Sequence, residues 1–203
     1  ASLTVSATTA GLALMLIPGS VLADRVGRQQ VMKTVLAIAA MLALATAFAP
    51  DFLSLLVLRA LLGAVIAGLP AAAMAYIGEE VATSAQARVM GLYIAGNALG
   101  GMSGRFVGAL LTDVGSWRIA LAVIGVFGLI AAVVFWRRLP DSRHFQPRAA
   151  TPARILRDAV AIYRAPGLPW LFLVAFLAMG AFVGLYNFLG FRLLESPYLL
   201  GQS

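Results

Sequence analysis

The chain has 203 residues, of which 62% are hydrophobic and 11% are charged. Soluble domains carry about a quarter charged residues, so this composition predicts an integral membrane protein. The net charge of +7 would point to nucleic acid in a soluble protein, but here the basic residues lie between apolar segments, and we expect no nucleic-acid partner. The absence of cysteine and the single His144 exclude disulfides, thiolate or histidine metal sites and a thiol nucleophile, so we expect neither metal nor cofactor.

Six segments are predicted to cross a bilayer as helices, because each supplies the run of about 20 apolar residues that a hydrocarbon core requires. They are residues 3–23, 31–49, 52–78, 90–111, 117–136 and 169–191. The first runs without charge to Ala23, which is longer than the core of a signal peptide, so we expect a true span of a longer protein. The predicted fold is an all-α, six-helix, multi-pass protein surrounded by the lipid of the cytoplasmic membrane.

The basic residues predict the orientation of these spans. Eleven Lys and Arg residues lie in one set of connections and two in the other, so the first set is predicted to be cytoplasmic. The longest connection, 137–168, separates five helices in 1–136 from one in 169–203. Apolar residues recur at helical spacing over 151–163 in this loop, which predicts a short amphipathic helix on the membrane surface, with a solvated linker as the alternative.

Three motifs on consecutive segments carry a family resemblance. The sequence Ser-Val-Leu-Ala-Asp-Arg-Val-Gly-Arg at 20–28 resembles the signature between the second and third helices of major facilitator superfamily transporters. Residues 55–63 resemble the arginine motif in the fourth helix of the proton-coupled members, and 96–105 resemble the fifth-helix glycine motif of the drug:proton antiporter and arabinose-efflux-like branch. Gln29 stands where a second basic residue is common, and Arg105 stands where that glycine motif usually has Gly.

The resemblance implies that the chain covers helices two to seven of a twelve-helix bundle, with the missing helices as its partners. It implies a secondary active transporter that exports a small organic molecule in exchange for protons by alternating access. Two alternatives stay open, a non-transporting receptor or assembly protein and a facilitator that takes up a sugar or metabolite. An enzyme is not expected, because the spans contain no paired carboxylates and no nucleophile with a base.

The resemblance implies a latch at the cytoplasmic ends of the helices, which holds the two halves together when the transporter faces outward. Its basic residues can pair with carboxylates at the inner end of the third span, and its glycine allows a tight backbone turn. The alternative interpretation is an ordinary basic loop that only sets topology. The predicted latch residues are Asp24, Arg25, Gly27, Arg28, Glu79 and Glu80.

Arg59 and Arg105 are predicted to lie inside spans, each about 12 Å from the outer loops at 1.5 Å per residue. An arginine does not release its proton at physiological pH, so each either tunes a carboxylate, holds an anionic group or anchors helices by hydrogen bonds. Tyr93 and Asn97 precede Arg105 on the same face and, with Asn187 on the last span, are candidate cavity residues. No Asp or Glu lies inside a predicted span, so the proton carrier is expected in the missing helices or at Glu79 or Glu80.

A stripe without side chains runs along the fourth predicted span, because glycine recurs there every four residues. Such a stripe allows another helix to approach backbone to backbone. Static packing and a sliding contact during alternating access are both compatible with the pattern. The residues of the stripe are Gly96, Gly100, Gly104 and Gly108.

Overall fold

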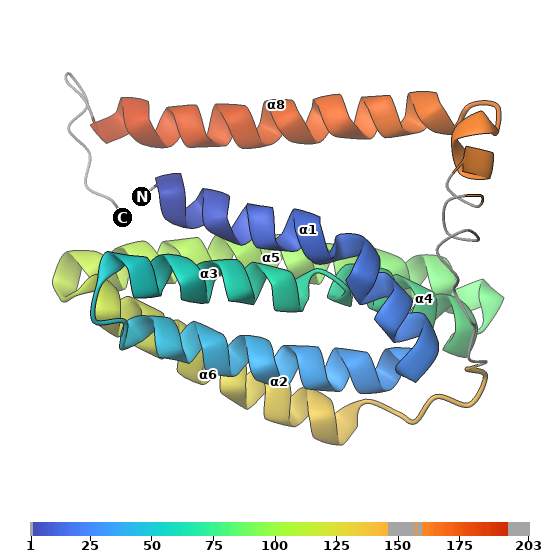
Figure 1. Ribbon diagram of the computed structural model, residues 1–203, viewed down its shortest axis with the longest axis horizontal. Coiled ribbons are helices and arrows are strands. Elements are labelled where there is room, and N and C mark those ends of the chain that lie inside the picture. Colours follow the sequence, from blue (N-terminus) through green and yellow to red (C-terminus); the bar gives the residue numbers. More distant parts are fainter. Residues whose placement is uncertain (1, 146–156, 158–159, 195–203) are drawn as a thin grey trace. The chain divides into compact units, whose positions relative to one another are not determined.

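A computed structural model of the chain describes residues 2–145, 157 and 160–194 (Figure 1). Within these residues the regular structure is helical and no strand occurs, which confirms the predicted all-α fold. The labelled helices are α1 (Ser2–Val26), α2 (Arg28–Ala47), α3 (Phe52–Ile66), α4 (Leu69–Glu80), α5 (Thr83–Val114), α6 (Trp117–Arg138) and α8 (Leu168–Leu194).

The chain divides into two compact units, Ala1–Ala149 and Ala150–Ser203, which are described separately. The second unit contains α8, whose described side chains are exposed from Trp170 onward. In the same unit the ring of Tyr163 lies 5.8 Å from that of Phe172. Most of the amphipathic helix predicted over 151–163 lies outside the described residues. Within its described part, residues 160–163 are helical.

Five of the six predicted spans are confirmed as helices long and apolar enough to cross a membrane, with α3 and α4 together forming one of them. The remaining prediction, 90–111, falls within α5. With 32 residues α5 has more than the necessary length, but its glycines, Asn97 and Arg105 make it less apolar than the other five. By length and composition the described residues thus support five of the six predicted spans, and the sixth, in α5, stays a prediction.

Close backbone packing joins α1 to the α3–α4 pair. A Cβ atom added at Gly63 would lie 2.8 Å from the carbonyl carbon of Thr8, and one added at Gly19 would lie 2.9 Å from the backbone nitrogen of Gly68. Both distances are shorter than the 3.5–4.0 Å of an ordinary carbon contact. These glycines therefore permit the approach of α1 to the α3–α4 pair (Figure 1).

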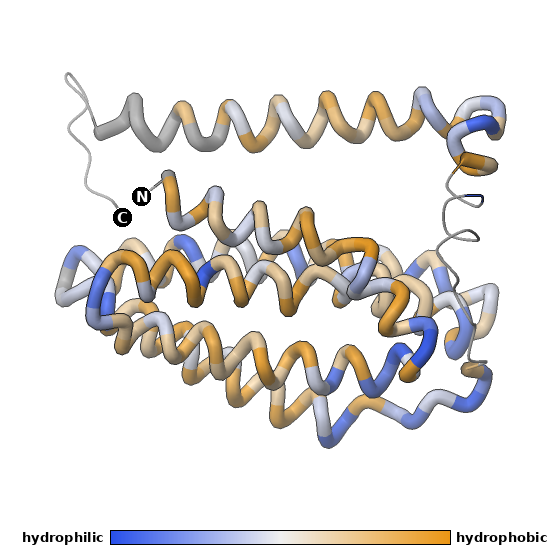
Figure 2. Tube along the Cα trace, viewed as in Figure 1, coloured by the Kyte–Doolittle hydropathy of each residue, from blue (hydrophilic) through white to orange (hydrophobic). Residues whose placement is uncertain are grey.

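The helices α2 and α6 form the other extensive contact of this unit. Gly125 of α6 lies against the backbone of Leu44, where an added Cβ would be 2.7 Å from the Leu44 Cα. A core of small and apolar side chains around Ala23, Met32 and Ala72 links α1, α2 and α4. Figure 2 shows the hydrophilic residues of this unit concentrated near the two ends of its helices, as expected for spans that cross an apolar layer.

Candidate functional site

The reversal from α1 to α2 places the charged residues of the 20–28 motif at one end of the bundle. Gly27 has a φ of 118°, a conformation that glycine adopts without a Cβ penalty. Its N–H donates to the Ala23 carbonyl at 3.1 Å and its carbonyl accepts from Val31 at 3.0 Å, so the turn closes α1 and opens α2 within one residue. The tight turn predicted at this glycine is confirmed.

Arg28 is the centre of an ion cluster between three helices. Its Nη2 lies 3.2 Å from Asp24 Oδ1 at the end of α1, and its Nη1 pairs with Glu79 Oε1 at the end of α4. The Arg28 side chain is only 10% exposed, and its Nε is buried without a hydrogen-bond partner among the described residues. Removing one partner from a buried pair is costly, because it leaves an uncompensated charge. The cluster therefore fixes α1, α2 and α4 relative to one another.

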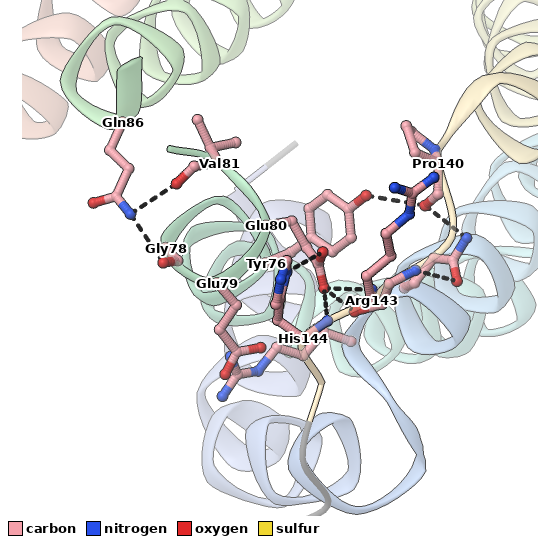
Figure 3. Close-up of polar contacts among 12 residues, drawn as sticks. Tyr76, Gly78, Glu79, Glu80, Val81, Gln86, Pro140, Arg143 and His144 are labelled. Atoms are coloured by element: carbon pink, nitrogen blue, oxygen red, sulfur yellow. Dashed lines mark hydrogen bonds and ion pairs between the residues drawn. The ribbon is translucent and has the colours of Figure 1, made fainter. Parts of the chain in front are cut away.

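Glu80 is one of the predicted latch residues, but its hydrogen-bond partners lie in the segment that follows α6. Its Oε1 accepts hydrogen bonds from the backbone N–H groups of Arg143 and His144, both at 2.9 Å, and from the Ser142 hydroxyl. Its Oε2 lies 3.1 Å from His144 Nδ1 (Figure 3). Hydrogen bonds to both oxygens favour the ionised carboxylate. Glu80 thus holds the segment that follows α6 against the end of α4.

Two further side chains hold this same segment, and the sequence analysis did not assign them a site role. Gln29 donates through Nε2 to the Pro140 carbonyl and to Asp141 Oδ1, both at 2.9 Å. The Tyr76 hydroxyl donates to the same Pro140 carbonyl at 2.9 Å (Figure 3). The signal available in the sequence was Gln29 itself, because an amide with both donor and acceptor groups replaces the basic residue common in the motif.

The connection from α4 to α5 is closed by Gln86. Its Nε2 donates to the carbonyls of Gly78 at 2.9 Å and Val81 at 3.0 Å, which satisfies acceptors that the end of α4 leaves open (Figure 3). The end of α4 that carries Glu79 and Glu80 is therefore ordered from two sides. This order sets the position of both carboxylates.

Arg59 lies in α3, one turn before Gly63, and is half-buried. Its Nε is buried without a hydrogen-bond partner, and no ion pair to Arg59 occurs in the described part of the chain. An arginine inside a span ordinarily faces the protein interior or water. Arg59 is therefore a half-buried cation whose Nε donor is unused among the described residues.

The remaining candidates lie mainly on α5. Asn97 and Arg105 are exposed, and Tyr93 is half-buried. With Tyr76, Tyr93 borders an apolar cavity of about 380 Å³ between α2, α4, α5 and α6. The side chain of Asn187 lies outside the described residues. The structure therefore leaves the polar face of α5 open without bringing it to the Arg28 cluster.

The glycine stripe of α5 has few neighbours in this chain. Among the described residues, no atom of another element lies within 4 Å of a Cβ added at Gly96, Gly100 or Gly104, and only the Ile124 side chain approaches Gly108, at 3.6 Å. Packing of this stripe against the missing helices stays a prediction. Glycines that do pack closely lie on α1, α3 and α6 and in the connection between α3 and α4.

No arrangement of three or more His, Asp or Glu side chains suited to a metal ion occurs among the described residues. The interactions described for the candidate residues are the ion pairs of Arg28 and the hydrogen bonds of Glu80, and Arg59 has an unpartnered Nε within the described chain. Residues 1–199 match the model of the Major Facilitator Superfamily. The chain belongs to that superfamily.

The relatives agree with this membership. The chain is 43% identical over 202 residues to the inner membrane transport protein YnfM of Escherichia coli, covering 100% of this chain and 48% of the relative. It is 42% identical to the uncharacterized MFS-type transporter YybF of Bacillus subtilis, covering 100% of this chain and 50% of that protein. A gallate transporter of Pseudomonas putida is 28% identical over 157 residues, which is 77% of this chain and 35% of the relative. The chain thus spans about half the length of the first two.

These findings confirm that the chain is part of a multi-pass membrane protein of this superfamily, as the three motifs predicted. The five apolar helices and the inner-membrane relative agree with a location in the cytoplasmic membrane.

Proposed function

We propose that the chain supplies helices two to seven of a twelve-helix secondary active transporter, which moves a small organic solute across the cytoplasmic membrane by alternating access. We place it in the drug:proton antiporter and arabinose-efflux-like branch, with export coupled to protons. The support for a transporter is membership of the superfamily and similarity to membrane transporters over the whole chain. The support for the branch is the glycine motif at 96–105.

The observation that carries alternating access is the interruption between α3 and α4. Helical structure stops at Ala67 and Gly68, close to the middle of the 29-residue span Phe52–Glu80. Gly19 of α1 packs directly against Gly68 at this point. Interrupted helices near the bilayer midplane are typical of transporters, where they line the solute site and allow parts of the bundle to move. A single span, interrupted near its middle, thus connects Arg59 in its outer half with Glu79 at its inner end.

The ion cluster around Arg28 is proposed to form the cytoplasmic latch. Asp24 and Glu79 contribute two negative charges against the single positive charge of Arg28. The excess negative charge is suited to a basic side chain or a helix N-terminus on the missing helices. Arg25 and Gly27 lie in the same loop, whereas Glu80 supports the latch by positioning the end of α4. A role in topology alone remains the alternative for the basic residues.

Arg59 is proposed to couple proton movement to transport by placing positive charge near a carboxylate of the missing helices. Its half-buried position and unpartnered Nε support this role. The polar face of α5, with Tyr93, Asn97 and Arg105, is proposed to line the solute cavity, and Asn187 is proposed to contribute from α8.

A second candidate function is uptake of a small organic acid. Gallate, named for one relative, carries a carboxylate. A half-buried guanidinium with an unpartnered Nε is suited to bind such an anion in a bidentate manner. Arg59 would then hold the solute and not tune a proton carrier.

The test uses the full-length protein in proteoliposomes under an imposed pH gradient, with gallate as the probe and a pH-sensitive dye in the lumen. Coupled export predicts proton movement that depends on gallate and persists in part in Arg59→Lys but not in Arg59→Ala, since lysine keeps the charge. Gallate uptake without proton movement supports the second function. Equal coupling in the wild type and both variants contradicts an electrostatic role for Arg59.

A further inference from the structure

A second cavity lies on the outside of the α2–α6 pair, away from the proposed site. These two helices lie side by side (Figure 1) and form an apolar groove of about 240 Å³. The groove is lined by Ala37, Met41, Leu129, Ala132, Val133, Trp136 and Arg137. Met41, Val133 and Trp136 are 55%, 51% and 44% exposed, so the groove is open along its length.

The groove opens away from the interior of the bundle. Met32 and Phe135 line the inner cavity between α2, α4, α5 and α6. Met41 is nine residues after Met32, which is about two and a half helical turns and places it on the opposite face of α2. Val133 is likewise displaced by two residues, or about 200°, from Phe135 on α6. The groove therefore faces outward, where a membrane-spanning bundle meets lipid.

The chemistry of the groove is asymmetric. Its lining is apolar from Leu129 onward and ends at Trp136 and Arg137 in the last turn of α6. The eight helical steps from Leu129 to Arg137 span about 12 Å, close to the thickness of one hydrocarbon leaflet. Tryptophan favours the membrane–water interface, and a basic side chain there attracts anionic lipid. Over the length of one leaflet, the groove lining thus changes from side chains suited to an acyl chain to side chains suited to a phosphate.

We propose that this groove binds one anionic phospholipid of the leaflet predicted to be cytoplasmic, with an acyl chain between α2 and α6 and the phosphate on Arg137. The apolar lining takes the chain, and Arg137 supplies the charge complementary to the headgroup. A second copy of the protein in the same orientation is a poorer occupant, because it brings its own Arg137 to the same depth, where like charges repel.

The test uses Trp136 as a reporter inside the groove. A variant of the full-length protein with Trp136 as its only tryptophan is placed in phosphatidylcholine vesicles that contain either brominated phosphatidylglycerol or brominated phosphatidylcholine. Bromine quenches indole fluorescence on contact. We expect phosphatidylglycerol to bind about fivefold better than phosphatidylcholine, the ratio that one interfacial cation produces.

Matched variants separate the groove from general surface charge. Arg137→Gln should bring the ratio near one, and Arg137→Lys should keep most of it. Arg138→Gln removes the same charge from a residue outside the groove lining and should retain the preference. Ala37→Leu fills the groove and should reduce quenching by both lipids.

Three results overturn the proposal. Equal quenching by the two lipids in the reporter protein contradicts anionic selectivity. Equal losses in Arg137→Gln and Arg138→Gln show diffuse surface attraction. Absence of quenching by either lipid shows that protein, such as a second copy, covers the groove.

Discussion

Glycine substitutions test whether α1 is held against α3 by direct backbone contact. In Gly63→Ala the new Cβ would lie 2.8 Å from the Thr8 carbonyl carbon and 3.0 Å from the Thr8 Cα, and closer still to the carbonyl oxygen. An ordinary carbon contact begins near 3.5 Å, so the two helices must separate by at least about 0.7 Å. Both atoms belong to backbone, which cannot rotate away.

Such overpacking costs about 1–3 kcal/mol. We therefore expect Gly63→Ala to lower the free energy of unfolding of the full-length protein by that amount, measured by denaturant titration in detergent micelles. Gly91→Ala is the matched control, because nothing lies within 4 Å of its added Cβ. It should be neutral or stabilising by up to about 1 kcal/mol, since alanine favours a helix over glycine.

A double variant adds a stricter test. Gly11 lies on the same interface, where its added Cβ would be 3.0 Å from the Ala60 carbonyl carbon. Separation of α1 from α3 relieves both clashes, so Gly11→Ala with Gly63→Ala should cost less than the sum of the single variants. Equal stability of Gly63→Ala and Gly91→Ala would refute the close approach of these helices.

Three further outcomes are expected. Gly104→Leu should abolish transport by the full-length protein at normal expression, whereas Leu99→Ile should not, because Gly104 belongs to the glycine stripe that is predicted to contact the missing helices and Leu99 does not; normal flux in Gly104→Leu would rule that contact out. Gln29→Ala should lower the unfolding free energy by about 0.5–1.5 kcal/mol and speed proteolysis after α6, because the hydrogen bonds to that exposed segment are lost; an unchanged digestion rate would show that Gln29 does not hold it. Reporter fusions at Gln86 should report cytoplasm and those at Ser116 the outer side, and the reverse would overturn the topology.

The ion cluster was partly predictable from the sequence. The spacing of Asp24 and Arg28 by four residues places them on one helical face, and their contact follows from that local rule. Glu79 and Glu80 were equally available as partners, since sequence gives no orientation at a helix end. The structure assigns Glu79 to Arg28 and Glu80 to backbone N–H groups after α6. That choice depends on tertiary placement of residues more than 60 positions away.

The glycine pattern shows the limit of periodicity. The four-residue repeat in α5 was conspicuous, but three of its members have open space around them in the described chain. Gly11, Gly63 and Gly125 form no comparable repeat, yet each contacts the backbone of another helix. A glycine repeat predicts a helix face without side chains. The position of a neighbouring helix determines whether that face is packed. The interruption at Gly68 has a local signal in Pro70, which lies in the first turn of α4, where proline is favoured.

The most direct test of the proposed latch is the sidedness of the α5 polar face. A single cysteine replaces Asn97 in a cysteine-free full-length protein, and membrane-impermeant thiol reagents are applied from each side. If the Arg28 cluster closes the cytoplasmic side, Glu79→Gln should raise cytoplasmic labelling by about tenfold, the effect of 1.4 kcal/mol, and lower outer labelling. Glu80→Gln should leave the ratio unchanged, because the amide oxygen still accepts the hydrogen bonds from the Arg143 and His144 N–H groups that position the end of α4. Identical labelling ratios in the Glu79→Gln variant and the unaltered protein would contradict alternating access governed by this cluster.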